Sequence, residues 1–313
     1  QQVSTTVHHL KMSSCLVLVV KFLSTSLLLK WFLMMMRHKQ QLFANGTLLT
    51  KATKLSFMAQ VSVILKRISK IYMMSLQDIL DHRHAVRHYD PAQPIDAGVV
   101  KKCIELASLA PTSSNMQLWE AFHVTDKTVL GKLAHACLDQ RSARTAQQIV
   151  VFVTRQSLYK QHAKAILDAA MDDINRNSPE EKKEKHMKLQ TAYYAKLIPF
   201  IYSRCFGLWG LVRKVLAQCI GLSRPIMRQV SEGDVRVCVH KSCALVAQTF
   251  MLAMSEVGYD TCPLEGFDSR LVKKALNLPY DTEINMVITC GIRMPDGVRR
   301  RYRLPFSEMY RRV

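Results

Sequence analysis

Arginines at two distant places in the chain have the chemistry to bind one phosphate together. Arg83 and Arg87 lie four residues apart in the segment HRHAVRHYD at 82–90, so on a helix they would share a face. A second basic run, RRRYR, occupies residues 299–303 near the C-terminus. Guanidinium groups stay charged and present forked donors that match phosphate oxygens. Each run alone is typical of a solvated basic surface, and only together do they indicate an anion site.

Two further segments between these runs could approach a ligand. The segment APTSSN at 110–115 has the Pro, Ser and Asn of an ordinary turn after a helix. The segment PLEGFD at 263–268 contains Gly266, and a glycine lets the backbone come close to a bound molecule. Neither segment specifies a function by itself.

Several common signatures of catalysis and cofactor binding are absent from the sequence. It contains no GxGxxG dinucleotide fingerprint, no GxxxxGK[ST] phosphate loop and no GxSxG nucleophile elbow. His82, His84 and His88 have metal-like spacing, but no clustered Cys or carboxylate completes a ligand set. We therefore predict no metal site and no catalytic nucleophile.

Capping residues and apolar periodicity predict the elements that would position these segments. Ser75 with Asp78 indicates a helix start, and Asp96, Asp126 and Asp268 each precede a helical pattern. Short apolar runs such as QIVVFVT indicate buried strands. The expected helices span 75–84, 96–109, 126–138, 160–175, 237–257 and 269–276, with one more starting at Ser178-Pro179-Glu180; the expected strands span 118–125, 148–154, 260–264 and 284–291. Few strands among many helices predict an α+β domain with a small central sheet.

In this order, the four segments resemble the FMN-dependent nitroreductase family over about residues 74–313. The resemblance implies a small antiparallel or mixed central sheet flanked by helices. It also implies a domain-entwined homodimer that buries two FMN sites at its interface.

The resemblance assigns roles to individual residues. Arg83, Arg301 and Arg303 would grip the FMN phosphate, and Arg87 would neighbour the flavin ring. The chain departs from the family at Ala85, where a phosphate-binding Ser is usual, and at Thr112, which also replaces a Ser. The implied cofactor site comprises Arg83, His84, Ala85, Arg87, Pro111, Thr112, Ser113, Asn115, Gln140, Arg141, Pro263, Leu264, Glu265, Gly266, Arg301 and Arg303.

Two parts of this set have distinctive implied roles. Residues 111–115 would reach the flavin across the dimer interface, and Asn115 keeps the family's spacing to Gln117 and Trp119. The backbone amides of Glu265 and Gly266 would contact the N5 and O4 edge of the flavin and stabilise negative charge there.

The implied activity is ping-pong transfer of hydride from NADH or NADPH, through flavin N5, to a nitroaromatic, quinone or similar acceptor. No protein nucleophile is needed, because the cofactor carries the chemistry. The alternative from another class is a basic nucleic-acid or anionic-membrane binding protein without redox activity. A flavin fold that has lost its activity is a third hypothesis, motivated by Ala85.

Charge and cysteine content constrain partners and compartment. The net charge is +20, and residues 1–77 hold ten Lys or Arg but no acid. A basic surface favours anionic partners without choosing among them, and nucleic acid is not predicted. Nine cysteines without a CxxC pair indicate an intracellular reducing compartment.

Two apolar segments lie outside the expected core. Residues 15–36 are long enough to cross a bilayer, although Lys21 and Lys30 interrupt them. We interpret residues 1–73 as a non-globular extension that is targeting, anchoring or dispensable. The location would then be cytoplasmic, or mitochondrial if the extension is a transit segment. Residues 197–222 form an apolar insertion, for which a lid over the substrate pocket is favoured over a membrane-surface patch.

Overall fold

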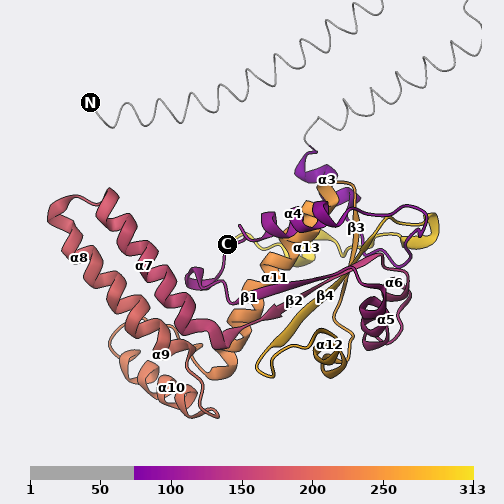
Figure 1. Cartoon of the computed structure of the whole chain (residues 1–313). Coiled ribbons are helices and arrows are strands. Elements are labelled where there is room, and N and C mark those ends of the chain that lie inside the picture. The colour runs from indigo at the N-terminus through magenta and orange to yellow at the C-terminus, as the bar shows by residue number, and fades with distance from the viewer. Residues whose placement is uncertain (1–73) are drawn as a thin grey trace, which may run out of the picture. The chain divides into compact units, whose positions relative to one another are not determined.

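The computed structural model describes residues 74–313, which form one compact unit (Figure 1). The interpretation of residues 1–73 as an extension lies outside the described residues. The helices are α3 (Leu76–His82), α4 (Ala97–Ala107), α5 (Lys127–Ala136), α6 (Arg141–Arg144), α7 (Tyr159–Asn177), α8 (Glu180–Thr191), α9 (Ile198–Tyr202), α10 (Leu208–Ile220), α11 (Glu232–Glu256), α12 (Ser269–Leu276) and α13 (Phe306–Met309). The strands are β1 (Trp119–Val124), β2 (Gln148–Thr154), β3 (Asp260–Leu264) and β4 (Glu283–Gly291).

The four strands form one antiparallel sheet in the order β1-β2-β4-β3. Every residue of β2 is buried, because β2 lies inside the sheet and helices cover both of its faces. Successive side chains of a strand point to opposite faces, so Val150 and Phe152 enter one core while Ile149 and Val151 enter the other. The expected α+β fold is confirmed, with a purely antiparallel sheet.

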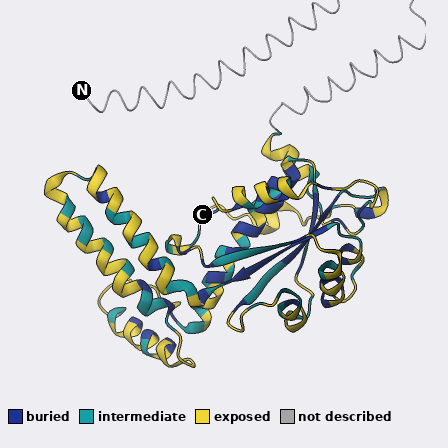
Figure 2. Cartoon of the chain, in the orientation of Figure 1, coloured by how far each residue is buried: buried dark blue, intermediate teal, exposed yellow. Residues whose placement is uncertain are grey.

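Different helices cover the two faces of this sheet. One face packs against α11 and α4, whose Phe250 and Cys103 are buried with Phe152 of β2. The other face packs against α5 and α12 through Leu133 and Val272. Figure 2 shows the resulting band of buried residues along the sheet and α11. Although α11 is long and apolar enough to cross a membrane, here it is the main helix of the core.

A second group of helices extends from the sheet as a helical arm, which we define as residues 159–222. Helices α7 and α8 run side by side, joined at their far end (Figure 1). A π-helical stretch, Ala192–Leu197, leads from α8 into α9 and α10. A small apolar cluster ties the arm to the rest of the domain, with Ala163, Ile198 and Tyr202 packed against Val235 and Val239 of α11.

Three local expectations are wrong. Helix α3 ends at His82, and the following residues are extended, so Arg83 and Arg87 do not share a helical face. Ser178 does not cap α8, because the residue before the helix is Pro179 and the Ser178 hydroxyl lies 3.1 Å from Nδ1 of His186. Helix α11 begins five residues earlier than expected, at a capping box formed by Ser231 and Asp234.

Candidate functional site

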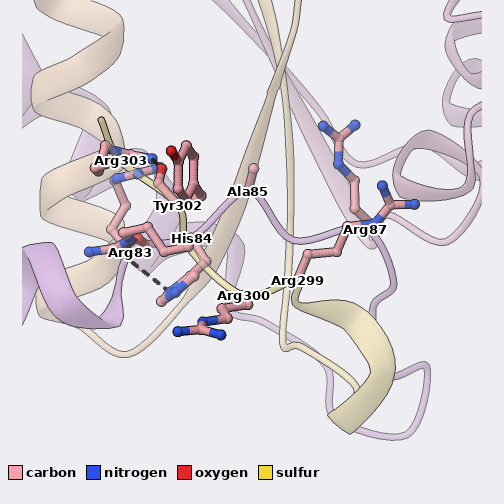
Figure 3. Close-up of a pocket in the computed structure, with 9 residues that line it drawn as sticks. Arg83, His84, Ala85, Arg87, Arg299, Arg300, Tyr302 and Arg303 are labelled. Atoms are coloured by element: carbon pink, nitrogen blue, oxygen red, sulfur yellow. Dashed lines mark hydrogen bonds between the residues drawn. The ribbon is translucent and has the colours of Figure 1, made fainter. Parts of the chain in front are cut away.

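The two basic runs meet in one pocket of about 200 Å³. Six arginines contribute to its lining, and none of the described residues that line it is acidic. Figure 3 shows Arg83, His84 and Arg303 on one side of Ala85, with Arg87 on the other. The lining residues are Arg83, His84, Ala85, Arg87, Arg299, Arg300, Arg301, Tyr302 and Arg303. We call this cavity the arginine pocket.

Backbone pairing with the sheet edge positions the first run. Ala85 forms a parallel bridge with Thr261 of β3, and the N–H of Val86 donates to the Thr261 carbonyl at 3.2 Å. In an extended segment every second residue lies on one side. Arg83, Ala85 and Arg87 line the pocket in this way, whereas Val86 is fully buried. His84 also lines the pocket, where its ring lies beside the Arg301 guanidinium. The four-residue spacing of Arg83 and Arg87 therefore brings both side chains to one pocket through the two-residue period of a strand, and not through the period of a helix.

The second run is held against the first by contacts between side chains and backbone. The Arg301 guanidinium donates to the carbonyl of Leu80 at 2.8 Å and to the carbonyl of Arg83. It also lies 3.8 Å from the carboxylate of Asp81. Arg301 thus closes the end of α3, where unpaired carbonyls carry partial negative charge. Part of its donor capacity is already used within the protein.

The electrostatics of the pocket favour an anion. Burial lowers the pKa of the Arg83 guanidinium, and the positive charges of Arg301 and Arg303 lower it further. Arginine nevertheless stays protonated in proteins. Arg83, Arg301 and Arg303 therefore all carry positive charge and repel one another across the pocket. A phosphate dianion would neutralise this repulsion and accept the forked donors. The donor set fits the phosphate of FMN, except that Ala85 offers no hydroxyl.

A second cavity of about 440 Å³ adjoins the arginine pocket and shares Arg87 and Arg299 with it. Its lining also contains Gln140, Arg141 and Asp296. This volume lies within the range of small-molecule sites, roughly 300–1,000 Å³. We call it the side cavity, and its position next to the phosphate-sized pocket suits the larger part of a nucleotide-like ligand.

An ion-pair cluster lies at the side cavity. Arg141 donates to Asp296 at 2.9 Å, and His88 Nδ1 lies 2.7 Å from the same carboxylate. The hydrogen bond from His88 lowers the pKa of Asp296, burial opposes this, and Arg141 adds to the lowering. Sequence reasoning included Arg141 but missed His88 and Asp296. The only available signal was the place of His88 beside Arg87 and of Asp296 in a Pro-Asp-Gly turn.

The segment after β3 joins the same region through Gln140. The Gln140 side-chain amide donates to the carbonyl of Gly266 at 2.9 Å. Leu264 is buried in the core, so only its backbone is available to a ligand, while Glu265 and Gly266 are exposed. Pro263 is half-buried within β3. The structure therefore places the Gly266 loop beside Gln140, the residue before α6.

The segment at 111–117 does not line either cavity. Thr112 accepts from the N–H of Gln117 at 3.1 Å, and the N–H of Ser113 donates to Ser242 of α11. Pro111, Ser113 and Asn115 are exposed. Within one chain the segment is thus a hydrogen-bonded surface loop separate from the arginine pocket.

The histidines near the pocket have other partners. His82 Nδ1 lies 2.9 Å from the Ser255 hydroxyl, and His84 Nδ1 lies 3.1 Å from the His82 carbonyl. In the part of the chain that the structure describes, no group of three or more His, Cys, Asp or Glu is arranged to hold a metal.

These features define an α+β protein with an anion pocket at the edge of a four-stranded sheet. The model of the nitroreductase family matches residues 80–292, which is most of the described chain. The chain belongs to the nitroreductase family and is an oxidoreductase.

Individual relatives agree with this assignment. A protein of Bacillus subtilis (strain 168) assigned as the NAD(P)H nitroreductase MhqN is 24% identical over 237 residues, which covers 75% of this chain and 98% of the relative. The oxygen-insensitive NAD(P)H nitroreductase of Enterobacter cloacae is 21% identical, covering 69% of this chain and 87% of its own length. A protein of Exiguobacterium sibiricum, described as a nitroreductase in complex with FMN, has a solved structure with a TM-score of 0.54 and 20% identity. It covers 77% of this chain and 98% of its own. The structural likeness supports the fold.

Proposed function

We propose that the arginine pocket and the side cavity together form an FMN site of an NAD(P)H-dependent oxidoreductase. The observation that carries this proposal is the meeting of six arginines from two segments about two hundred residues apart in one pocket. A solvated basic surface would not bring like charges together around a cavity. A phosphate-bearing ligand gives this arrangement a physical reason.

FMN is the cofactor and NADH or NADPH is the reductant. Two relatives bear names that specify NAD(P)H, and one related structure is described as a complex with FMN. When bound, FMN supplies the two-electron redox chemistry, which the side chains of this protein do not have. The protein then has to bind the cofactor, orient it and tune its surroundings.

Each part of the site has a task in this arrangement. Arg83 and Arg303 hold the phosphate, together with the remaining donors of Arg301. Arg87, which lines both cavities, places a positive charge between the phosphate and the ring. The hydrogen bond from Gln140 fixes the Gly266 loop, so that its backbone amides can face the redox-active edge of the ring. Preorganised donors of this kind stabilise negative charge without reorganising during the reaction.

A homodimer completes the proposed site. The loop at 111–117 is held by hydrogen bonds, carries exposed amide and hydroxyl groups, and does not line either cavity of its own chain. A partner's copy of this loop would reach the ring. The acceptor is a nitroaromatic, quinone or similar small molecule that takes electrons by a ping-pong scheme at the open face.

The proposed location is an intracellular reducing compartment. Eight cysteines of the described chain are free, and five of these are buried. Burial raises the pKa of the Cys103 and Cys137 thiols to about 11, so both remain protonated and unreactive at neutral pH. They therefore behave as core residues that need no oxidising environment.

The visible absorption spectrum of the purified full-length chain tests this function. We expect a yellow protein that releases about one FMN per chain on heating and is bleached by NADH or NADPH without oxygen. Sedimentation of the same sample should give the mass of a dimer. A protein that stays colourless after incubation with FMN would refute the proposal and favour a basic binding protein without redox activity.

A further inference from the structure

The outer face of α10 is apolar, exposed and unpaired within the described chain. Leu211 and Val215 are 61% and 54% exposed, and Leu208 and Trp209 lie on the same helix, also exposed. Figure 1 draws α10 at the outer edge of the helical arm, away from the sheet. Isolated exposed apolar residues are normal, but a stripe of them along one helix marks an interaction surface.

The arm holds this face outward by specific contacts. The inner face of α10 consists of Gly210, Arg213 and Ala217, which are buried. Arg213 donates to the carbonyl of Val230 at 2.7 Å and to that of Phe200 at 2.9 Å. At Gly210 an added Cβ would lie only 2.8 Å from the backbone of α11, so no larger residue fits there. The apolar face therefore cannot turn inward without breaking these contacts.

The charge around α10 identifies the kind of partner. Residues 185–231 contain no Asp or Glu, and they contain eight Lys or Arg. Lys214 lies on α10 itself, and Arg224 and Arg228 follow it; all three are exposed. An exposed apolar face with a mainly basic border is the pattern of a helix that lies in the interface of an anionic membrane. Acidic residues approach α10 from the start of α11, where Glu232 accepts from the N–H of Gly207 and Asp234 lies near Lys214. The exposed residues that follow α10, Arg224 and Arg228, keep the rest of this border basic.

We propose that α10 docks onto an anionic lipid membrane, with its outer apolar face in the headgroup region and Lys214, Arg224 and Arg228 against lipid phosphates. The docking places the helical arm on the membrane surface while the arginine pocket stays on the sheet. It stands on residues outside the proposed cofactor site, so it holds or fails independently of that function.

Vesicle co-sedimentation of the full-length chain tests this proposal. The vesicles contain phosphatidylcholine with roughly one third phosphatidylserine, and the variant is Leu211→Glu/Val215→Glu. We expect the membrane partition coefficient to fall at least about tenfold, because two apolar side chains leave the lipid and two negative charges face it. The matched control is Leu106→Glu/Leu109→Glu, at exposed apolar positions near the end of α4, which should bind as the wild type does.

A milder variant and two further readouts make the result decisive. Lys214→Glu reverses one exposed charge and leaves the apolar face intact, and it should weaken binding at least about fivefold. Wild-type binding should also drop on pure phosphatidylcholine and at high salt. Equal binding by wild type and both α10 variants would overturn the proposal and assign any lipid affinity to other parts of the chain. Loss of a dimer in the α10 variants, without vesicles, would overturn it too and make the face a contact between two copies.

Discussion

Replacing Arg83 with methionine tests whether this arginine binds the phosphate of the cofactor or only stabilises the fold. Methionine keeps most of the side-chain length but removes the charge. The carbonyl of Arg83, which accepts from Arg301, belongs to the backbone and is not removed by the substitution. The variant therefore changes the pocket's charge while leaving the contact between the two basic runs in place.

The size of the effect follows from the chemistry of the lost contact. A hydrogen bond to a charged group contributes about 1.5–3 kcal/mol, and about 1.4 kcal/mol corresponds to a tenfold change in Kd. We therefore expect FMN to bind about 10- to 100-fold more weakly. At a fixed excess of FMN the ligand-dependent stabilisation falls by about 1.4–2.7 kcal/mol, which lowers the Tm of the FMN-bound protein by roughly 3–10 °C.

The cofactor-free protein should respond in the opposite direction. The charges of Arg301 and Arg303 lower the pKa of Arg83, which means that they disfavour its charged form. Removing that charge relieves repulsion, so the Tm without FMN should stay the same or rise. A purely structural arginine would give a lower Tm in both states.

Flavin-fluorescence titration and thermal unfolding, each with and without FMN, measure both effects. Arg270→Met is the control, because Arg270 is an exposed residue of α12 that lines neither cavity. Arg303→Met should resemble Arg83→Met. Wild-type FMN affinity in Arg83→Met and Arg303→Met would refute the assignment of the phosphate to this pocket.

Two other substitutions test the cofactor site and the pH dependence of the fold. Ala85 is an exposed residue of the pocket lining, and Ala85→Ser adds a hydroxyl there. The variant should bind FMN about three- to tenfold more tightly in the same flavin-fluorescence titration. Weaker binding would contradict the placement of the phosphate beside residue 85. Burial opposes ionisation of Glu283, but hydrogen bonds from His240 at 2.9 Å and from Arg236 outweigh it and lower the pKa of Glu283. A carboxyl whose pKa is lowered by folding stabilises the protein above its unfolded pKa of about 4.3, and that contribution is lost as the pH falls through the folded value. Urea unfolding should therefore show Glu283→Gln to be about 1–3 kcal/mol less stable than wild type at pH 7, and the difference should shrink as the pH falls below about 4. A difference that does not change with pH would show that the ionised carboxylate is not the cause.

The sequence alone determined the elements whose signals are local. Asp96, Asp126 and Asp268 cap α4, α5 and α12 as expected, because a capping carboxylate bonds amides only two or three residues away. The strand expected at residues 148–154 matches β2, since a short apolar run rich in β-branched residues is typical of a buried strand. Gly258 has φ +79° just after α11, as a glycine that ends a helix commonly does.

The resemblance identified in the sequence brought together residues that no local pattern connects. It placed Arg83 with Arg301 and Arg303, and the structure shows these residues lining one pocket. Local periodicity could not have found this, because more than two hundred residues separate the two runs. Local spacing also predicted the wrong geometry for Arg83 and Arg87. A separation of four residues is compatible both with one face of a helix and with one side of a strand.

Only the tertiary structure decided how the pocket is built. Residues 83–87 are extended because the Val86 N–H pairs with Thr261 and the Arg87 N–H pairs with Gly297, both distant in the chain. The end of α3 is closed by Arg301, again from a distant segment. The apolar pattern of α10 likewise could not show which face is covered, because that depends on where Arg213 finds its carbonyl partners. Local preference fixes an element, whereas the partners that complete its hydrogen bonds and cover its apolar face are fixed only when the whole chain packs.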